Sequence, residues 1–420
     1  MIDITDKSYC CGCAACVSSC PRRCITMVED TEGFLYPKVD AVSCVNCGLC
    51  EKVCHELHPY GEHLPIEVLA GQSYDDEIRR SSSSGGLFSL LASECIKNGG
   101  VVFGVRFDEN WQCKLDYAET LEGLKVFRGS KYVQARTDTA YIDALRFLKE
   151  GRIVLFSGTP CQIAGLKHFV RRAYDNLYTI DVICHGVPSP KVWKLYINQE
   201  IKKARKGENT VSLLPNHLVS EGDTLLQEER VEIEGFFFRD KRLGWRKYSF
   251  TLTLAEATAD GKKNTVSLSS IYYKNSYMRA FLNNLDLRPS CSSCQAKAGR
   301  SHSDITLADC WGAELEHKAI YDDLGTNSIL VNTEKGKALL SQIIYKSEQS
   351  NYSLLLEHNA ALVKSYKPHP KREEFFRLVN NGEADITHIV KKLLDPPMWK
   401  QFLNMPMKIV SYIRIHLFSK

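Results

Sequence analysis

The chain has 420 residues, which exceeds the usual size of one domain and predicts two or three domains. Apolar residues make up 44% of the chain and charged residues 25%, so the composition excludes a wholly disordered protein. The formal net charge of +4 is too small for an extended nucleic-acid footprint, and no nucleic-acid partner is expected.

The cysteine content is high for the compartment that the sequence indicates. The first residues lack a basic segment followed by an apolar stretch, and no run approaches the roughly 18 apolar residues of a membrane span. We therefore expect a cytoplasmic protein, in which disulfides seldom persist. The spacing of the 17 cysteines must then reflect metal binding, catalysis or burial, and ten of them lie within the first 54 residues.

The chain order predicts an N-terminal module followed by a larger domain. Residues 1–60 are rich in cysteine and end in a link rich in Pro, Gly and His, which predicts a separate domain. Beyond it, apolar strands alternate with helices of ten or more residues, a pattern typical of a sheet with parallel strands covered by helices. Ligands of such sheets lie beyond the carboxyl ends of the strands. The expected elements are strands at 101–107, 152–158 and 178–184 and helices at 139–150, 160–172 and 190–203.

The second half of the chain predicts an antiparallel section and a helical end. Residues 207–228 are polar and irregular, and they are interpreted as a surface loop. Alternating runs predict strands at 231–240, 248–255 and 265–273, with Asp260–Gly261 as a turn. The expected fold class is α+β or α/β, with a two-cluster ferredoxin fold, then a mixed-sheet flavin-binding domain, then a helical tail. The expected boundaries are 1–60, 66–335 (in two parts, 66–155 and 156–335) and 336–420.

Two cysteine runs near the N-terminus share the spacing C-x2-C-x2-C-x3-C. In bacterial ferredoxins the first three thiolates of such a run bind one 4Fe-4S cluster and the fourth binds the other. A pair of zinc knuckles is the alternative, because C-x2-C pairs also suit tetrahedral zinc. Cys11 and Cys24 fall outside the spacing, and Cys24 is interpreted as a core residue. The predicted ligands are Cys10, Cys13, Cys16 and Cys54 for one cluster, and Cys44, Cys47, Cys50 and Cys20 for the other.

Beyond the cysteine runs, the chain contains dense local strings but neither G-x-G-x-x-G nor the phosphate loop G-x4-G-K-[ST]. In this order the strings resemble those of the coenzyme F-420 hydrogenase/dehydrogenase beta-subunit family, which also includes plant 7-hydroxymethyl chlorophyll a reductase. The resemblance covers about residues 1–335. The strings are SSSSGGLFS (81–89), FRGSKYVQA (127–135), FSGTPCQIAGL (156–166), CHGVPSP (184–190), FRDKRLGW (238–245) and the stretch from 291 to 312.

The resemblance implies FAD in the central domain, with two-electron chemistry at the flavin and one-electron transfer through the clusters. Lys131 would supply positive charge to the flavin or its pyrophosphate, and His185 would move a proton, although a packed histidine is the alternative for His185. Arg239 and its basic neighbours would hold an anionic group or form a solvated hairpin. The expected cofactor-binding residues are Ser83, Ser84, Gly85, Gly86, Ser130, Lys131, Tyr132, Thr159, Pro160, Asp309 and Trp311.

Four of the remaining cysteines predict a third 4Fe-4S cluster. Cys161 and Cys184 lie at or near the ends of successive core strands, and Cys291 and Cys294 form a C-x2-C pair. Four thiolates are the number that such a cluster needs. Burial as small apolar side chains is the alternative, since free cysteine is among the most buried residue types. Cys310 is expected to be either a substitute ligand of this cluster or a buried core residue.

These observations predict an anaerobic-type oxidoreductase dependent on FAD and 4Fe-4S clusters, with a small organic substrate. Coenzyme F-420 and a polysaccharide-pathway metabolite are the candidates that the resemblance supplies. The redox partner is expected to be a ferredoxin or a complex subunit, and an oligomer is left open. A non-catalytic electron-transfer subunit is the alternative function. The basic tail is expected to dock on the protein itself, with attachment to a membrane surface as the minor alternative.

Overall fold

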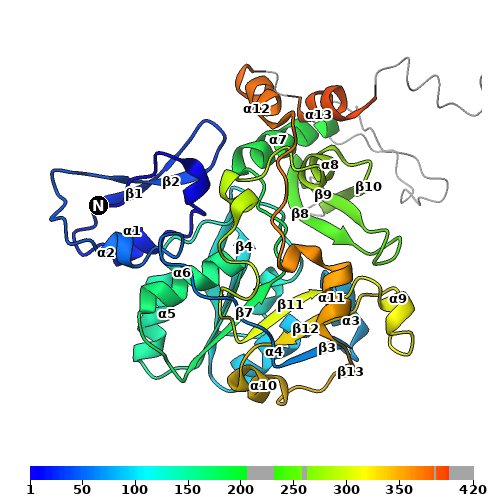
Figure 1. Cartoon of the computed structure of the whole chain (residues 1–420). Coiled ribbons are helices and arrows are strands. Elements are labelled where there is room, and N and C mark those ends of the chain that lie inside the picture. The colour runs from blue at the N-terminus through cyan, green and yellow to red at the C-terminus, as the bar shows by residue number, and fades with distance from the viewer. Residues whose placement is uncertain (206–230, 258–262, 383–384, 397–420) are drawn as a thin grey trace, which may run out of the picture.

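The computed structural model describes residues 1–205, 231–257, 263–382 and 385–396. An N-terminal lobe lies beside a larger body built on an eight-stranded sheet, and a second, smaller sheet with helices lies at one end of that body (Figure 1). The loop expected at 207–228, the turn at Asp260–Gly261 and the last part of the tail lie outside the described residues.

The N-terminal lobe holds both cysteine runs on short elements. Its two strands pair antiparallel, and each of its two α-helices begins after a residue with positive φ, Ala14 or Gly48. The positive φ lets the chain turn tightly into each short helix, so cysteines of one run lie on both sides of the turn. The elements are η1 (Lys7–Tyr9), α1 (Ala15–Ser19), β1 (Ile25–Glu29), β2 (Leu35–Val39) and α2 (Leu49–Lys52).

The large sheet is mixed, as expected, with a parallel centre and antiparallel flanks. Its strand order is β13-β3-β12-β11-β7-β6-β4-β5, and the four strands from β11 to β4 run parallel. The outer strands on both sides pair antiparallel. The strands are β3 (Glu67–Gln72), β4 (Val101–Phe107), β5 (Cys113–Ala118), β6 (Val154–Gly158), β7 (Leu177–Val182), β11 (Ile305–Asp309), β12 (Asn327–Val331) and β13 (Lys346–Gln349).

Helices cover both faces of this sheet, and the alternation of side chains along the strands explains why. Val101 and Phe103 pack with α5 and α6, whereas Val102 between them packs with α4 and α10. A strand buried on both faces has a continuous apolar run, which is what the sequence shows here. The covering helices are α4 (Leu87–Lys97), α5 (Ala140–Lys149), α6 (Pro160–Val170) and α10 (Glu334–Leu340).

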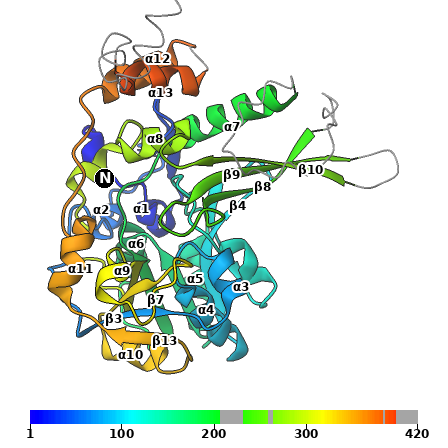
Figure 2. The same ribbon diagram turned by 90° about the vertical axis from the view of Figure 1, so that its right-hand side faces the viewer.

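The second sheet is antiparallel, in the order β10-β9-β8, and extends away from the body (Figure 2). Its base packs on helices through a large aromatic core that includes Trp193, Phe250 and Tyr277. The elements of this part are α7 (Pro190–Arg205), β8 (Val231–Asp240), β9 (Ser249–Ala257), β10 (Lys263–Ile271), α8 (Ser276–Leu282), α12 (Arg372–Asn380) and α13 (Ile386–Leu394). The remaining short helices of the structure are α3 (Asp76–Ser81), η2 (Gly123–Phe127), η3 (Pro289–Ser293), α9 (Ala313–Glu316), α11 (Tyr352–His358) and η4 (Ala360–Leu362).

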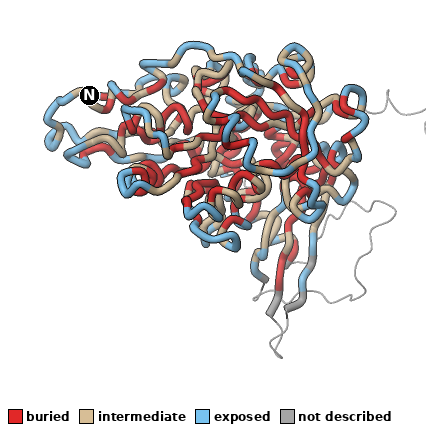
Figure 3. Tube along the Cα trace, turned by 90° about the horizontal axis from the view of Figure 1, so that it is seen from below, coloured by how far each residue is buried: buried red, intermediate tan, exposed pale blue. Residues whose placement is uncertain are grey.

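The observed elements match the expected ones in type and order, but two expected boundaries differ. The body does not end at residue 335, because β13 pairs with β3 in the large sheet. The body also does not divide at residue 155, because β6 spans that position and pairs with both β4 and β7. Buried residues lie throughout the interior of the body (Figure 3). The helical tail begins only after β13.

The lobe contacts the body closely at helix α6. A Cβ atom added to Gly165 would lie 3.0 Å from both Cβ and Sγ of Cys13 and 2.8 Å from the Tyr141 hydroxyl. Ala15 and Val53 of the lobe are buried in the same apolar cluster as α5 and α6. Glycine at position 165 therefore lets the first cysteine run approach the helix backbone.

We expect Gly165→Val to destabilise the docked lobe. Overpacking of a close contact typically costs about 1–3 kcal/mol, so the free energy of unfolding should fall by about that amount. Anaerobic urea denaturation measures it. Gly61→Ala is the matched control, because a Cβ at Gly61 meets nothing within 4 Å. Equal midpoints for Gly165→Val and the parent protein would contradict this account of the contact.

Candidate functional site

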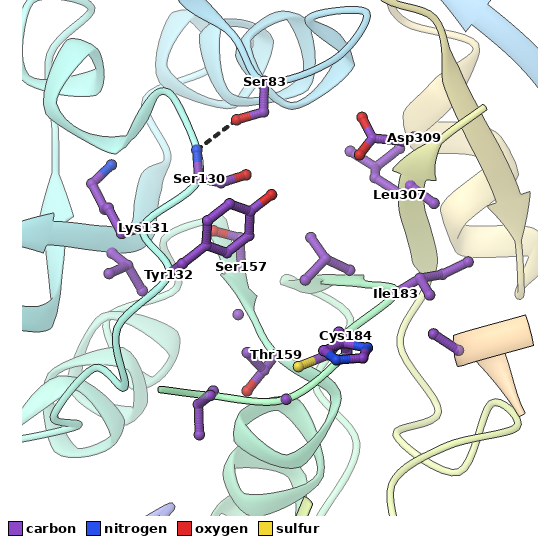
Figure 4. Close-up of a pocket in the computed structure, with 18 of the residues that line it drawn as sticks. Ser83, Ser130, Lys131, Tyr132, Ser157, Thr159, Ile183, Cys184, Leu307 and Asp309 are labelled. Carbon is purple, nitrogen blue, oxygen red and sulfur yellow. Dashed lines mark hydrogen bonds between the residues drawn. The ribbon is translucent and has the colours of Figure 1, made fainter. Parts of the chain in front are cut away.

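A cavity of about 590 Å³ opens at the carboxyl ends of the parallel strands. Residues at or just beyond the ends of β6, β7 and β11 line it, together with the start of helix α4 and the loop after Arg128 (Figure 4). The N-terminal lobe also contributes to its wall through Cys11, Cys13 and Glu56. This is the edge at which ligands of such sheets bind.

The serine turn before α4 forms one wall and is braced from behind. The Ser83 hydroxyl accepts a hydrogen bond from the Ser130 backbone N–H at 2.6 Å (Figure 4). Ser84 donates its hydroxyl to the Thr326 carbonyl, and the Ser84 carbonyl accepts from the Lys241 ammonium, each at 2.7 Å. Gly86 caps α4 with φ of 87°, which side chains rarely adopt. The turn is therefore a fixed cradle of hydroxyl and N–H groups at a helix N-terminus.

The loop at Ser130–Tyr132 forms the adjoining wall. The Lys131 ammonium donates to the carbonyls of Arg128 at 3.0 Å and Gly129 at 3.2 Å, and burial lowers its pKa to about 8. Tyr132 leaves the loop in a different direction, toward the centre of the site (Figure 4). Its ring stacks on Phe281 with 4.7 Å between centroids. Lys131 thus braces its own loop, while Tyr132 faces the cavity.

A buried ion pair and stacked aromatic rings form the opposite wall. The Arg239 guanidinium donates to the Asp309 carboxylate at 2.6 Å and lies over the Tyr248 ring, 4.2 Å from its centroid. The rings of Trp245 and Trp311 stack with 4.9 Å between centroids. The negative carboxylate compensates the charge of the buried guanidinium at this wall.

Thr159 and His185 lie near the cysteines at the inner end of the cavity. The Thr159 hydroxyl is 3.2 Å from the Cys161 sulfur, at the first turn of α6. His185 Nε2 is 2.6 Å from Asn284 Oδ1, and burial lowers the pKa of the imidazole. A neutral imidazole with one nitrogen fixed by Asn284 has its other nitrogen available to accept a proton.

The structure brings most of the expected cofactor-binding residues to this one cavity. Gly85 and Pro160 do not line it: Gly85 packs on the backbone of β3 and β12, and Pro160 opens helix α6. The expected residues that do line it are Ser83, Ser84, Gly86, Ser130, Lys131, Tyr132, Thr159, His185, Asp309 and Trp311.

The cysteines of the first run gather with the last cysteine of the second. Burial, with smaller contributions from the neighbouring thiols of Cys10 and Cys54, raises the pKa of the Cys16 thiol to about 12. Burial raises the pKa of Cys54 as well, with a smaller contribution from Cys10. The fold thus places Cys54 beside the first run.

Cys20 instead lies beside the second run. It lines a small cavity in the lobe together with Cys24, Cys44, Cys47 and Cys50. The sulfurs of Cys20 and Cys24 are 3.4 Å apart, and Cys24 is buried in the core of the lobe, as expected. Cys47 is exposed, in contrast to the buried Cys50. The exchange of fourth cysteines between the runs matches the expected pattern of ligand sharing.

The four cysteines expected to form a third site line the same cavity wall. Burial raises the pKa of the Cys291 thiol, and the thiols of Cys184, Cys161 and Cys294 raise it further. Cys184 likewise has its pKa raised to about 12, first by burial and then by Cys161. The four thiols come from three segments, line one wall of the cavity and influence one another electrostatically.

Cys11 is the residue of the lobe that lies beside this third set of cysteines. Its sulfur is 3.0 Å from His55 Nε2, and the group formed by Cys11, Cys13 and His55 has ligand atoms within 4.8 Å of one another. A hydrogen bond with Cys11 is the largest cause of the raised pKa of Cys161. Burial raises the pKa of the adjacent Glu56 to about 7. Cys11 therefore joins the first run to the wall of the cavity.

The remaining cysteines pack as small apolar side chains. Cys310 is buried with Ala70, Ala313 and Ile320 and is absent from the cavity lining. Cys95 and Cys113 are buried in the clusters on the two sides of the body.

Sequence reasoning missed two residues that hold the lobe to the body, Gln134 and Arg288, and one lobe residue that lines the cavity, Glu56. Gln134 and Arg288 donate to backbone carbonyls of Cys11 and Cys10. No local pattern marks such residues, although Gln134 stands inside one of the strings and Arg288 stands three residues before Cys291. Among the described residues, no helix has the length and apolar character needed to cross a membrane.

The lobe with its cysteine runs, joined to a sheet with a cysteine-lined cavity, defines an iron–sulfur redox protein with a role in electron transfer. Residues 9–56 match a 4Fe-4S dicluster domain, and residues 151–350 match the C terminus of the coenzyme F420 hydrogenase/dehydrogenase beta subunit. Residues 151–350 are thus similar to the C terminus of this beta subunit, and a 4Fe-4S dicluster domain precedes them at residues 9–56.

One solved structure similar to this chain is from the F420-reducing [NiFe] hydrogenase complex of Methanosarcina barkeri, determined with xenon. It has 14% sequence identity and a TM-score of 0.41, and the match covers 79% of this chain and 91% of that chain. No curated protein matches the sequence.

We expect Cys291→Ala to remove one cluster. Loss of one thiolate from a four-thiolate site should lower the iron content from about twelve to about eight atoms per chain, at four atoms for each cluster. Anaerobic purification with iron and sulfide determination measures it. Cys310→Ala is the control, because Cys310 is also a free cysteine but is buried outside the cavity. An unchanged iron content in Cys291→Ala would exclude a third cluster at these cysteines.

Proposed function

We propose that this protein is an oxidoreductase dependent on FAD and 4Fe-4S clusters. It couples one-electron transfer through the clusters to the two-electron reduction or oxidation of an organic substrate. The observation that carries the proposal is the shared cavity. One wall includes Cys161, Cys184, Cys291 and Cys294, and the other walls include the serine turn, the Tyr132 loop and the Arg239–Asp309 pair.

The cavity fits a flavin nucleotide in volume and in donor chemistry. Pockets for ligands of this kind are typically about 300–1,000 Å³, and this one is about 590 Å³. Among the described residues, Nε of Arg128 and of Arg239 are buried without a hydrogen-bond partner. These two donors and the start of α4 suit the phosphates of a dinucleotide. When bound, FAD supplies hydride transfer on one side and single-electron exchange on the other.

The geometry favours one order of electron transfer. Exposed Cys47 places the second run nearest to a protein partner, while the first run is docked on α6. Cys11 connects the first run to Cys161 at the cavity wall. A single-electron carrier, either a ferredoxin or a subunit of a larger complex, would therefore exchange electrons at the exposed end of the lobe.

The polar residues of the cavity would orient the substrate and handle its proton. Lys131 would hold the 128–132 loop in place beside the flavin, and His185, fixed by Asn284, would accept or donate a proton at Nδ1. Coenzyme F-420 or a polysaccharide-pathway metabolite is the proposed substrate. The apolar lining, with Phe281 and Leu307, offers contact area for a planar ring such as that of coenzyme F-420.

Anaerobic purification with iron, sulfide and flavin quantified per chain tests the proposal. We expect one flavin together with three clusters. Clusters without flavin, even after incubation with FAD, would overturn the oxidoreductase and leave a non-catalytic electron-transfer subunit.

We expect Lys131→Ala to weaken flavin binding. Its ammonium holds two carbonyls of the loop that lines the cavity, and hydrogen bonds of charged groups are worth about 1.5–3 kcal/mol, which corresponds to about tenfold or more in the dissociation constant. Fluorescence titration of the deflavinated protein with FAD measures this change. The exposed Lys125, in the same segment, provides the control variant Lys125→Ala. Equal affinities would exclude Lys131 from the site.

A further inference from the structure

Arg288 is a fully buried cation at the junction of the lobe and the body. Its side chain has 0% exposure. Nε donates to the Cys10 carbonyl at 2.7 Å, Nη2 donates to the Leu35 carbonyl at 2.9 Å, and Nη1 donates to Gln134 Oε1 at 2.9 Å. Nη2 also lies 3.7 Å from the Cys10 sulfur. Four acceptors, three of them from the lobe, thus fix one guanidinium.

The charge of this guanidinium has no carboxylate partner in the described part of the chain. Other interdomain arginines do have one: Arg372 donates to both carboxylate oxygens of Glu32. The groups that act electrostatically on Arg288 are instead the thiols of Cys10, Cys11 and Cys291 and the phenol of Tyr36. Glu56 is affected by Arg288 as well, but it makes no ion pair with it.

A buried cation without compensation costs several kcal/mol, so the fold must supply a negative charge nearby. Among the lobe groups in direct contact with Arg288, the Cys10 sulfur is the one that can carry it, because the other contacts are neutral carbonyls and the rings of Phe34 and Tyr36. Cysteines that bind a metal cluster are deprotonated. Arg288 is therefore matched to a ligated Cys10 thiolate and not to a free thiol.

We propose that Arg288 sets the reduction potential of the cluster held by Cys10, making it a better electron acceptor than the cluster of the second run. The proposal rests on the two N-terminal clusters of the proposed function. One electron moves from the second-run site to the first-run site, and no bond forms or breaks. The fixed positive charge and the hydrogen bond at the sulfur both favour the more negative, reduced state.

The second run lacks an equivalent cation in the described structure. Cys47 is exposed to solvent, and the neighbouring Arg22 and Arg23 are exposed as well, so water screens their charges. Arg288 acts in a dry environment, where a charge interacts more strongly. The difference between the two sites gives electrons a direction from the outer end of the lobe toward the cavity.

An anaerobic redox titration of the full chain, monitored by EPR, tests this proposal. Cys47→Ser assigns the second-run signal. In the parent protein, we expect the first-run cluster to have the higher potential. In Arg288→Met, the equilibrium between the two sites should shift at least tenfold away from the first run, which corresponds to about 59 mV for one electron. Arg288→Lys should keep most of the potential difference of the parent protein, because lysine retains the charge.

Arg372→Met is the matched control, since Arg372 also bridges lobe and body but has no contact with a sulfur. Its potentials should stay unchanged. Equal shifts in Arg288→Met and Arg372→Met would show a general effect of loosened docking and overturn the proposal. If Arg288→Met does not assemble its clusters, the parent protein still decides, because a lower potential for its first-run cluster overturns the proposal. Absence of clusters from the parent protein would instead refute the proposed function itself.

Discussion

The arrangement of the whole molecule depends on how the backbone of the first cysteine run is held against the body. Two side chains of the body donate to carbonyls of consecutive residues in that run, Arg288 to Cys10 and Gln134 to Cys11. The same run approaches helix α6 at a position where only glycine fits. Hydrogen bonds made in a dry interface are costly to leave unpaired, so they fix the orientation of the lobe as well as its contact. The position of Cys11 beside Cys161 follows from that orientation.

Much of the fold could be predicted because its signals are local. The strands β4, β6 and β7 are five to seven residues long and mostly apolar, and the cysteine runs specify their chemistry by spacing alone. The two-sided burial that the structure shows is the reason for those continuous runs. β13 could not be predicted, because its sequence KSEQ is polar and its pairing with β3 depends on the edge that β3 offers.

The candidate site was predictable in its residues more than in their roles. The strings identified most of the cavity wall, but not the direction in which each side chain leaves its loop. Lys131 turns to carbonyls of its own loop after Gly129, which has φ of 78°. Arg239 is held by Asp309, seventy residues away in the chain. Arg288 had no signal at all, because its partners belong to a segment near the opposite end of the sequence.

The pairing of β3 has a consequence for how the protein is made. Its neighbours in the sheet are β12 and β13, with Gly71 opposite Asn327 and Gln72 opposite Lys346. A chain emerging from the ribosome therefore completes the N-terminal lobe and the β4–β7 centre long before β3 can pair. Until then β3, with the apolar sequence EVLAGQ, has no strand on either side. Unpaired strands of this kind are exposed to association with other chains, so the late arrival of residues 327–349 is the step at which a cell would need to protect this protein.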